Sequence, residues 1–162
     1  MIYCCSNPND GQHIIEGKFS NKIGFNIRPY TEQLLEKLSE LYEIVVFTAS
    51  EQYYADPIIN FLDPSGKYIS HRLYRRHCFR YGQFFVKDLR ILDNVLLQDL
   101  IIVDNHIYSF GFQLDNGVPV NTWERSKEDD ELSVITDYLM FVVNSNDLRS
   151  DNRKTFRLIE AM

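Results

Sequence analysis

Two apolar stretches that end in polar residues decide the fold: Ile44-Val45-Val46-Phe47-Thr48-Ala49-Ser50 and Leu100-Ile101-Ile102-Val103-Asp104-Asn105. An unbroken, largely β-branched run of this length is typical of a strand that is buried on both faces, as in a parallel sheet. In such sheets the binding residues gather at the carboxyl ends of the strands. We therefore expect residues 44–47 and 101–103 to be buried parallel strands, with Thr48 and Asn105 opening into one cleft.

Amphipathic segments flank these two runs. Leucines at positions 34, 35, 38 and 41 share one helical face, and Pro29 stands where a helix can begin, since proline has no amide hydrogen to lose. Ser50 is expected to cap a second helix that runs through Leu62 and stops near the turn Asp63-Pro64-Ser65-Gly66. The acidic cluster at 129–131 predicts the start of the last helix, because carboxylates stabilise a helix N-terminus.

The remaining segments are shorter. The sequence predicts short extended pieces in residues 1–28, short strands and turns in 67–86, a helical patch in 89–97 and a third, weaker strand in 118–120. Helices that alternate with buried strands predict an α/β fold with a parallel sheet. No repeat or linker divides the 162 residues, so we expect a single domain over residues 1–162.

Composition narrows the class of protein. Hydrophobic residues make up 44% of the chain, which favours a packed globule over a disordered chain, and the net charge of -6 argues against non-specific nucleic-acid binding. No apolar run approaches the roughly 20 residues that span a bilayer, and no signal-peptide pattern is present at the start. Cys4, Cys5 and Cys78 lack metal-ligand spacing, so we expect reduced thiols.

Polar residues at the strand ends, together with one lysine, are the candidate functional groups. Taken alone, Thr48, Lys87 and the pair Asp104-Asn105 each have a simple structural explanation, as a helix cap, a surface ion pair and a turn. Together they provide a hydroxyl, an ammonium group and oxygen ligands, which a phosphoryl-transfer site needs because its catalysis is mostly positioning and charge neutralisation. Aspartate and asparagine oxygens also suit Mg2+.

Seven ordered blocks carry a resemblance to a known family. In chain order they are Arg28-Pro29-Tyr30, Tyr42-Glu43-Ile44-Val45-Val46-Phe47-Thr48-Ala49-Ser50, Tyr54-Ala55-Asp56-Pro57, Arg72-Leu73-Tyr74-Arg75, Val86-Lys87-Asp88-Leu89, Ile102-Val103-Asp104-Asn105 and Asn116-Gly117-Val118-Pro119-Val120. On these blocks the chain resembles the small C-terminal-domain phosphatases, the NLI-interacting-factor-like family of the haloacid dehalogenase superfamily. The resemblance implies a Rossmann-like haloacid dehalogenase fold with a small β insertion between the second and third motifs. It also implies a magnesium-dependent protein serine/threonine phosphatase.

The resemblance implies a role for each matched residue of the site. Thr48 would hold a phosphoryl oxygen, and Lys87 would neutralise charge on the phosphate. Asn105 would bind Mg2+, with Asp104 beside it organising the metal and its waters. The partner implied is a phosphoserine or phosphothreonine segment of another protein, with no nucleic acid and no membrane segment in this chain.

The resemblance implies that two arginines bind the substrate. Two departures from the family pattern put the identity of that substrate in doubt. Arg72 and Arg75 lie in the insertion that lines the phosphopeptide groove, where an arginine fork suits phosphate. Arg76-His77 replaces an acidic residue followed by a small polar one, which adds to a basic patch on an acidic protein. His106-Ile107-Tyr108 replaces the usual Ser-Pro step, so the family's substrate preference does not transfer directly.

The nucleophile motif of the family does not occur in this sequence. The family nucleophile is the first aspartate of Asp-x-Asp-x-Thr at the end of the central strand, whereas Asp10 is the only aspartate before Arg28. The resemblance therefore predicts an N-terminally incomplete domain that lacks most of its central first strand, binds Mg2+ weakly and is inactive as written. We expect residues 1–5 or a partner chain to fill part of that slot, or the isolated domain to be poorly stable.

Three explanations of the missing motif stay open. The chain is an incomplete product of an active phosphatase gene, a pseudophosphatase that binds phosphopeptides without cleaving them, or an interaction module like the presequence-translocase receptor of the mitochondrial inner membrane. We expect a nuclear or cytoplasmic location, with the mitochondrial inner membrane as the alternative.

Overall fold

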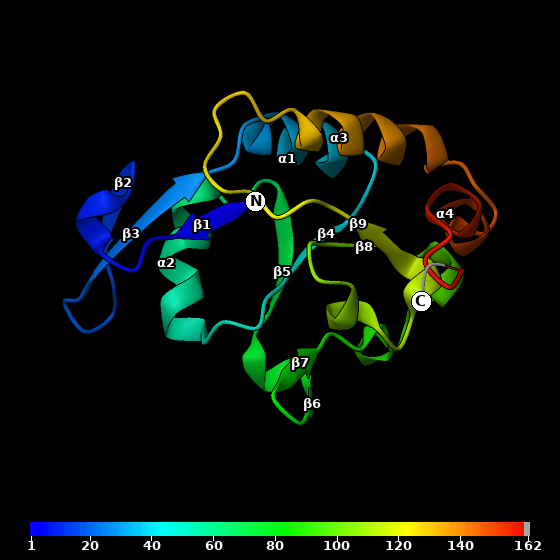
Figure 1. Cartoon of the computed structure of the whole chain (residues 1–162), viewed down its shortest axis with the longest axis horizontal. Helices are drawn as coiled ribbons and strands as arrows, with labels where there is room; N and C mark the ends of the chain where they lie inside the picture. Colours follow the sequence, from blue (N-terminus) through cyan, green and yellow to red (C-terminus); the bar gives the residue numbers. More distant parts are fainter. Residues whose placement is uncertain (161–162) are drawn as a thin grey trace. The chain divides into compact units, whose positions relative to one another are not determined.

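The chain divides into two compact units in the computed structural model, which describes residues 1–160 (Figure 1). The first unit comprises Met1–Arg76 and Trp123–Asp137. The second comprises His77–Thr122 and the chain from Tyr138 onward. Each unit has strands and a buried apolar cluster of its own, and the expectation of a single domain over residues 1–162 stays a prediction.

An antiparallel sheet and a parallel strand pair form the first unit. Its strands and helices are β1 (Ile2–Cys4), β2 (His13–Glu16), β3 (Lys22–Ile27), α1 (Thr31–Ser39), β4 (Ile44–Phe47), α2 (Gln52–Leu62) and β5 (Ile69–Leu73). β3 is the central strand of the antiparallel sheet, in the order β1-β3-β2, and β4 pairs with β5 in parallel. Ile23 and Phe25 of β3 pack with Ile58, so α2 covers one face of the antiparallel sheet (Figure 1).

The second unit contains a hairpin, a parallel strand pair and a C-terminal helix. Its elements are β6 (Phe79–Tyr81), β7 (Phe84–Val86), β8 (Ile102–Asp104), β9 (Gly117–Pro119) and α4 (Leu148–Phe156), while α3 (Glu131–Val142) carries the chain into this unit from the first. β6 and β7 are antiparallel, whereas β8 and β9 are parallel. The buried cluster is Leu89, Ile102 and Phe110.

The two strands predicted first are confirmed in place but not in burial. β4 covers residues 44–47 as predicted, and β8 begins one residue later than predicted. The expectation that both are buried on both faces is wrong, because every residue of β4 is only partly buried and Val103 in β8 is 38% exposed. The physical reason is that each strand belongs to a two-stranded sheet. Among the described residues, β4 pairs with β5 alone and β8 pairs with β9 alone, so one edge of each strand has no neighbouring strand.

Helix starts differ from the prediction at two positions. α1 begins at Thr31 rather than Pro29, because Tyr30 has a left-handed backbone (φ 64°) and Thr31 Oγ1 donates to the Arg28 carbonyl (2.7 Å). Ser50 does not cap α2, since Glu51 holds the cap position. The end of α2 near Asp63 and the start of α3 within the acidic cluster are confirmed.

Two other predictions about helices are corrected. The helical patch at 89–97 is wrong, because this stretch contains the 3-10 turn Leu89–Ile91 and only the start of a second, Leu97–Asp99. Asp93-Asn94 between the turns offers polar side chains that favour irregular backbone. α4 has no counterpart among the predicted elements, since its sequence is mostly polar and carries no long apolar stripe.

Residues 1–5 do not fill the slot of a central parallel strand. β1 pairs antiparallel with β3, with Ile2 opposite Ile27, and Cys5 N–H donates to the Gly24 carbonyl (2.9 Å). Their backbone groups are satisfied at the edge of the antiparallel sheet, so the expectation that they occupy the slot is wrong.

A buried ion pair that the sequence did not reveal fixes the start of α3 in the first unit. Arg28 is 2% exposed, and its guanidinium donates to both carboxylate oxygens of Asp129 (2.7 and 2.8 Å). This hydrogen bonding with Arg28 lowers the pKa of Asp129 against the opposing effect of burial. Arg28, in the first family block, therefore has a structural role.

Asp63 closes the turn after α2. Its carboxylate is 2% exposed and accepts backbone N–H groups from Lys67 (2.8 Å), Tyr68 and Ile69 (both 2.9 Å). Burial alone raises the pKa of this carboxyl, but the three hydrogen bonds outweigh it, so the pKa of Asp63 is lowered. The turn therefore fixes the start of β5, which is paired with β4.

Candidate functional site

The loop that leaves β4 holds the first candidate residue. Thr48 N–H donates to the carbonyl of Leu73 in β5 (2.9 Å), and Ser50 N–H donates to Thr48 Oγ1 (3.1 Å). The hydroxyl of Thr48 is therefore anchored at the carboxyl end of β4, where a parallel strand presents binding groups.

Arg75 lies against the same loop. Its Nε donates to the Ala49 carbonyl (2.6 Å), and its backbone N–H donates to the Ser50 carbonyl (3.0 Å). Its Nη1 is 3.4 Å from Glu51 Oε1, in an ion pair whose side chains are 44% and 46% exposed. Exposed pairs contribute little, so an anionic ligand can displace Glu51 at small energetic cost. The first unit thus brings Thr48 and Arg75 to one loop.

Arg72 instead joins β5 to α2. Its Nη1 donates to Asn60 Oδ1 (2.8 Å) and to Asp56 Oδ1 (3.2 Å), and Tyr74 Oη donates to the same Asp56 oxygen (2.5 Å). Burial raises the pKa of Asp56, but hydrogen bonds from Tyr74, Gln52 and Arg72 outweigh it and lower this pKa. These contacts stabilise the packing of strand and helix, and a substrate-binding role for Arg72 stays a prediction.

A nearly buried ion pair is the centre of the candidate residues in the second unit. Lys87 follows β7 and its Nζ pairs with Asp104 Oδ2 at the end of β8, with the two side chains 13% and 6% exposed. The other oxygen, Asp104 Oδ1, accepts the backbone N–H of His106 (2.8 Å), and Lys87 N–H donates to the Ser109 carbonyl (2.6 Å). Backbone and side chain of both residues are therefore held in place.

Asn105 is oriented by its sequence neighbour His106 and by Thr122, which the sequence did not identify. Its Nδ2 donates to Thr122 Oγ1 (3.0 Å) and lies 3.3 Å from His106 Nε2. The amide hydrogens of Asn105 are directed at these two groups. Its other side-chain atom, Oδ1, is therefore available to a cation as far as the described residues are concerned. Thr122 follows β9, the parallel neighbour of β8, so its position after a strand is the signal that could have revealed it.

Comparison with known proteins identifies the family. The family model for NLI interacting factor-like phosphatases matches residues 1–149. The chain belongs to this family. It is 35% identical over 164 aligned residues to CTD small phosphatase-like protein 2 of Dictyostelium discoideum, covering 99% of this chain and 29% of that protein. It is also 32% identical to CTD small phosphatase-like protein 3 of Caenorhabditis elegans, covering 98% of this chain and 56% of that protein.

Solved structures support the fold. A variant of the fission yeast RNA polymerase II CTD phosphatase Fcp1, bound to beryllium fluoride, superimposes with a TM-score of 0.57 at 18% identity, over 95% of this chain and 43% of that one. The α/β haloacid dehalogenase fold predicted from the sequence is therefore confirmed. The chain spans less than two thirds of the length of these relatives.

The donors for the family's metal ion are only partly represented. Asp104 and Asn105 offer hard oxygen atoms of the kind that Mg2+ prefers, so the chemistry of the pair fits the ion. Among residues 1–160, however, no group of three His, Cys, Asp or Glu side chains could hold a metal ion. Since Mg2+ requires near-octahedral coordination, two oxygen donors alone do not make a tight site.

The predicted site residues are distributed over both units. Thr48, Arg72 and Arg75 belong to the first unit, whereas Lys87, Asp104 and Asn105 belong to the second. We call Thr48 with Arg75 the β4 half-site, and Lys87 with Asp104 and Asn105 the β8 half-site. That the two half-sites open into one cleft stays a prediction.

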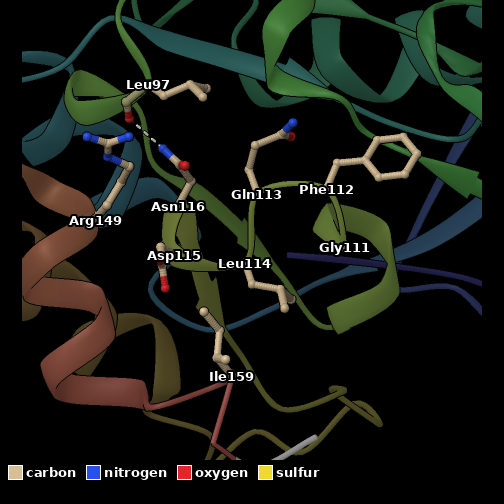
Figure 2. A pocket seen from close by; sticks show the side chains of 9 residues that line it. All are labelled: Leu97, Gly111, Phe112, Gln113, Leu114, Asp115, Asn116, Arg149 and Ile159. Carbon is tan, nitrogen blue, oxygen red and sulfur yellow. Dashed lines mark hydrogen bonds between the residues drawn. The ribbon is translucent and has the colours of Figure 1, made fainter.

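An open pocket of about 330 Å³ also lies in the second unit, and the predicted site residues do not line it (Figure 2). Leu97, Leu114 and Ile159 contribute apolar surface, and Arg149 lies at its edge. The Asn116 amide donates to the carbonyls of Leu97 (2.5 Å) and Leu100 (2.8 Å), so this buried side chain braces one wall.

Two further observations concern the cysteines and the helices. Among the described residues, Cys4, Cys5 and Cys78 form no disulfide bond. Within residues 1–160, none of the helices combines the length and the apolar character that crossing a bilayer requires.

Proposed function

We propose that this chain is a magnesium-dependent, protein serine/threonine phosphatase-type domain that, in its 162 residues, binds phosphorylated protein segments without hydrolysing them. The observation that carries the proposal is the β8 half-site, where Lys87 and Asp104 form a nearly buried ion pair beside Asn105. We further propose that both units act as one domain, in which the two half-sites hold the same phosphate.

Each residue has a defined task in binding. Lys87 donates one N–H of its ammonium group to Asp104, and the two remaining N–H groups can donate to phosphate oxygens. Asp104 fixes the position of that ammonium group, and together with Asn105 it would hold Mg2+, which supplies positive charge to the phosphate when bound. At the β4 half-site, Thr48 would contact a phosphoryl oxygen and Arg75 would add a guanidinium donor.

The sequence supports the proposed absence of hydrolysis. The family transfers the phosphoryl group to the first aspartate of Asp-x-Asp-x-Thr, and these 162 residues contain no two aspartates separated by a single residue. Binding and charge neutralisation without a nucleophile recover only a small part of the rate. The same residues would support catalysis if the motif were supplied, which keeps an active phosphatase as the second candidate.

The proposed partner and location follow the relatives. Two of them, in fission yeast and in budding yeast, are named nuclear envelope morphology protein 1, and they are 34% and 33% identical to this chain. We propose that this chain binds a phosphoserine or phosphothreonine segment of a protein in the nucleus or cytoplasm, where free cysteines stay reduced.

Titration of a fluorescein-labelled phosphoserine peptide, followed by anisotropy, tests the proposal. Lys87→Gln is expected to weaken binding by about tenfold or more, because hydrogen bonds to charged groups contribute about 1.5–3 kcal/mol. Lys154→Ala removes the same charge from an exposed position in α4 and should leave the affinity unchanged. Circular dichroism must report a folded Lys87→Gln protein. If that folded variant binds as tightly as the unaltered protein, the proposed site is wrong.

A further inference from the structure

The β6–β7 hairpin and the chain after β8 expose an unusual number of aromatic rings. Phe79, Tyr81 and Phe84 belong to the hairpin, Tyr108 to the 3-10 turn Ile107–Phe110, and Phe112 follows that turn. They are 51%, 68%, 39%, 47% and 45% exposed, respectively. Contiguous apolar surface on a protein commonly marks an interaction site. We call these five residues the aromatic surface.

The geometry of the hairpin makes this surface continuous. Tyr81 is paired with Phe84, and Phe79 lies two residues before Tyr81, so the three side chains share one face of the hairpin. The ring of Phe79 lies 5.4 Å from that of Phe112, and the ring of Phe84 lies 4.9 Å from that of Tyr108. Phe112 also lines the pocket of the second unit (Figure 2), so the aromatic surface borders that pocket.

The aromatic surface begins at the β8 half-site. His106 donates its backbone N–H to Asp104 Oδ1, and its ring stacks on Tyr108 with centroids 5.0 Å apart. Tyr108 in turn contacts Phe84, and Lys87 directly follows the hairpin. All of these residues belong to the second unit, so their continuity does not depend on the first.

The charges around the hairpin suit a segment that carries negative charge. The chain has no Asp or Glu between Asp63 and Asp88, while this stretch contains Arg80 and Lys87 among its basic residues. Asp88 is paired with Arg90, whose guanidinium also lies 5.8 Å from the centroid of the Phe112 ring. An anionic segment would therefore meet cations and aromatic faces together.

We propose that the aromatic surface binds the segment that flanks the phosphorylated residue and selects substrates with large apolar side chains close to it. The inference rests on the proposed function, because the β8 half-site must hold the phosphate. An extended segment advances about 3.3 Å per residue, so side chains about two to four residues from the phosphate reach the rings. The residues that replace the family's Ser-Pro step, His106-Ile107-Tyr108, thereby contribute to substrate choice.

Three phosphoserine peptides of equal length and charge test the inference by fluorescence anisotropy. One carries phenylalanine two and four residues before the phosphoserine, one carries it two and four residues after, and one carries alanine at all four positions. One of the phenylalanine peptides is expected to bind about tenfold more tightly than the alanine peptide. Tyr81→Ala, alone and combined with Phe84→Ala, should reduce this advantage. Phe141→Ala is the matched control, because it removes an aromatic ring that is 84% exposed on α3.

The outcomes separate the inference from the proposed function. Equal affinity for all three peptides, with Lys87→Gln still weakening each, overturns the inference alone. Affinity that is insensitive to Lys87→Gln for every peptide overturns the proposed function and the inference with it. If Tyr81→Ala weakens binding of an oligouridylate or of anionic lipid vesicles but not of the phenylalanine peptide, the surface serves nucleic acid or membrane and the inference is wrong. A dimer in sedimentation that Tyr81→Ala dissociates also overturns it.

Discussion

The carboxyl ends of the two parallel strand pairs hold their candidate binding residues in different ways. At the end of β8, Lys87 and Asp104 are 13% and 6% exposed, and both carboxylate oxygens of Asp104 accept hydrogen bonds. At the end of β4, Arg75 and Glu51 are 44% and 46% exposed, and Arg75 Nε donates to the backbone carbonyl of Ala49. A buried pair fixes geometry because breaking it is costly, whereas an exposed pair can change partners cheaply. The comparison indicates one rigid and one adaptable half-site.

Supplying the nucleophile should produce the largest effect. An apolar strand that ends in Asp-x-Asp-x-Thr-Leu, grafted before Ile2, is expected to give magnesium-dependent hydrolysis of phosphoserine peptides, faster by many orders of magnitude than the ungrafted chain. Release of inorganic phosphate is the measurement. Lys87→Ala or Asn105→Ala in the graft should abolish it.

The control is the same graft with asparagine in place of its first aspartate, which should be inactive. Hydrolysis by the ungrafted chain that is lost with Lys87→Ala would contradict the account, since the rigid half-site would then catalyse the reaction without an aspartate nucleophile.

The free energy of unfolding of two variants should distinguish the rigid half-site from the adaptable one. Lys87→Met leaves Asp104 as a nearly buried charge without its partner, so the free energy of unfolding in urea should fall by about 3 kcal/mol. Arg75→Ala removes an exposed ion pair and a hydrogen bond to a carbonyl, so its loss should stay near 1 kcal/mol. Equal losses for the two variants would remove the distinction between a rigid and an adaptable half-site.

The lowered pKa of Asp88, the residue after Lys87, can be tested by a pH titration. Bonds from the Arg90 side chain, against an opposing effect of burial, hold the pKa of Asp88 at about 2, and Gln113 adds a further hydrogen bond. A lowered pKa means that Asp88 stabilises the fold above the ordinary carboxyl value of 3.8 and that this contribution disappears as pH falls toward 2. Carbon-detected NMR titration should find a midpoint near pH 2, and Arg90→Ala should raise it. A midpoint near 3.8 in the unaltered protein would show that the pair does not form.

The smallest effect is expected from the adaptable half-site. Arg75→Ala should weaken phosphopeptide binding by a few-fold and reduce its dependence on salt, because one exposed guanidinium is lost. Affinity measured at about 50 and 200 mM salt checks both effects. Arg76→Ala, at the neighbouring arginine, is the comparison variant. An unchanged affinity and salt dependence for Arg75→Ala would exclude this arginine from the site.

The sequence predicted the parts of the fold that depend on local pattern. The runs at 44–47 and 101–103 gave the strands because β-branched repetition is a local signal, and the seven blocks gave the family. The Arg28–Asp129 pair could not be predicted, since its partners lie 101 residues apart and nothing in either segment marks the other. Thr122 was missed beside Asn105 for a similar reason, because only the pairing of β8 with β9 brings it there.

The candidate residues of each half-site were proposed from the sequence, whereas the contacts that orient them could not be predicted from it. Strand burial was overestimated because an apolar run does not tell how many strands accompany it, and β4 and β8 each have one parallel neighbour. Arg72 illustrates the same limit, since its bonds to Asp56 and Asn60 depend on how α2 packs beside β5.

The central claim is that one phosphate is held by both half-sites, and NMR chemical-shift mapping tests it most directly. A phosphoserine peptide is titrated into isotope-labelled protein while the Lys87 Nζ and Thr48 hydroxyl-bearing side-chain signals are followed. The account predicts that both signals shift with the same apparent Kd, and that the unphosphorylated peptide shifts neither. Shifts confined to one half-site, or different apparent Kd values for the two, would contradict it.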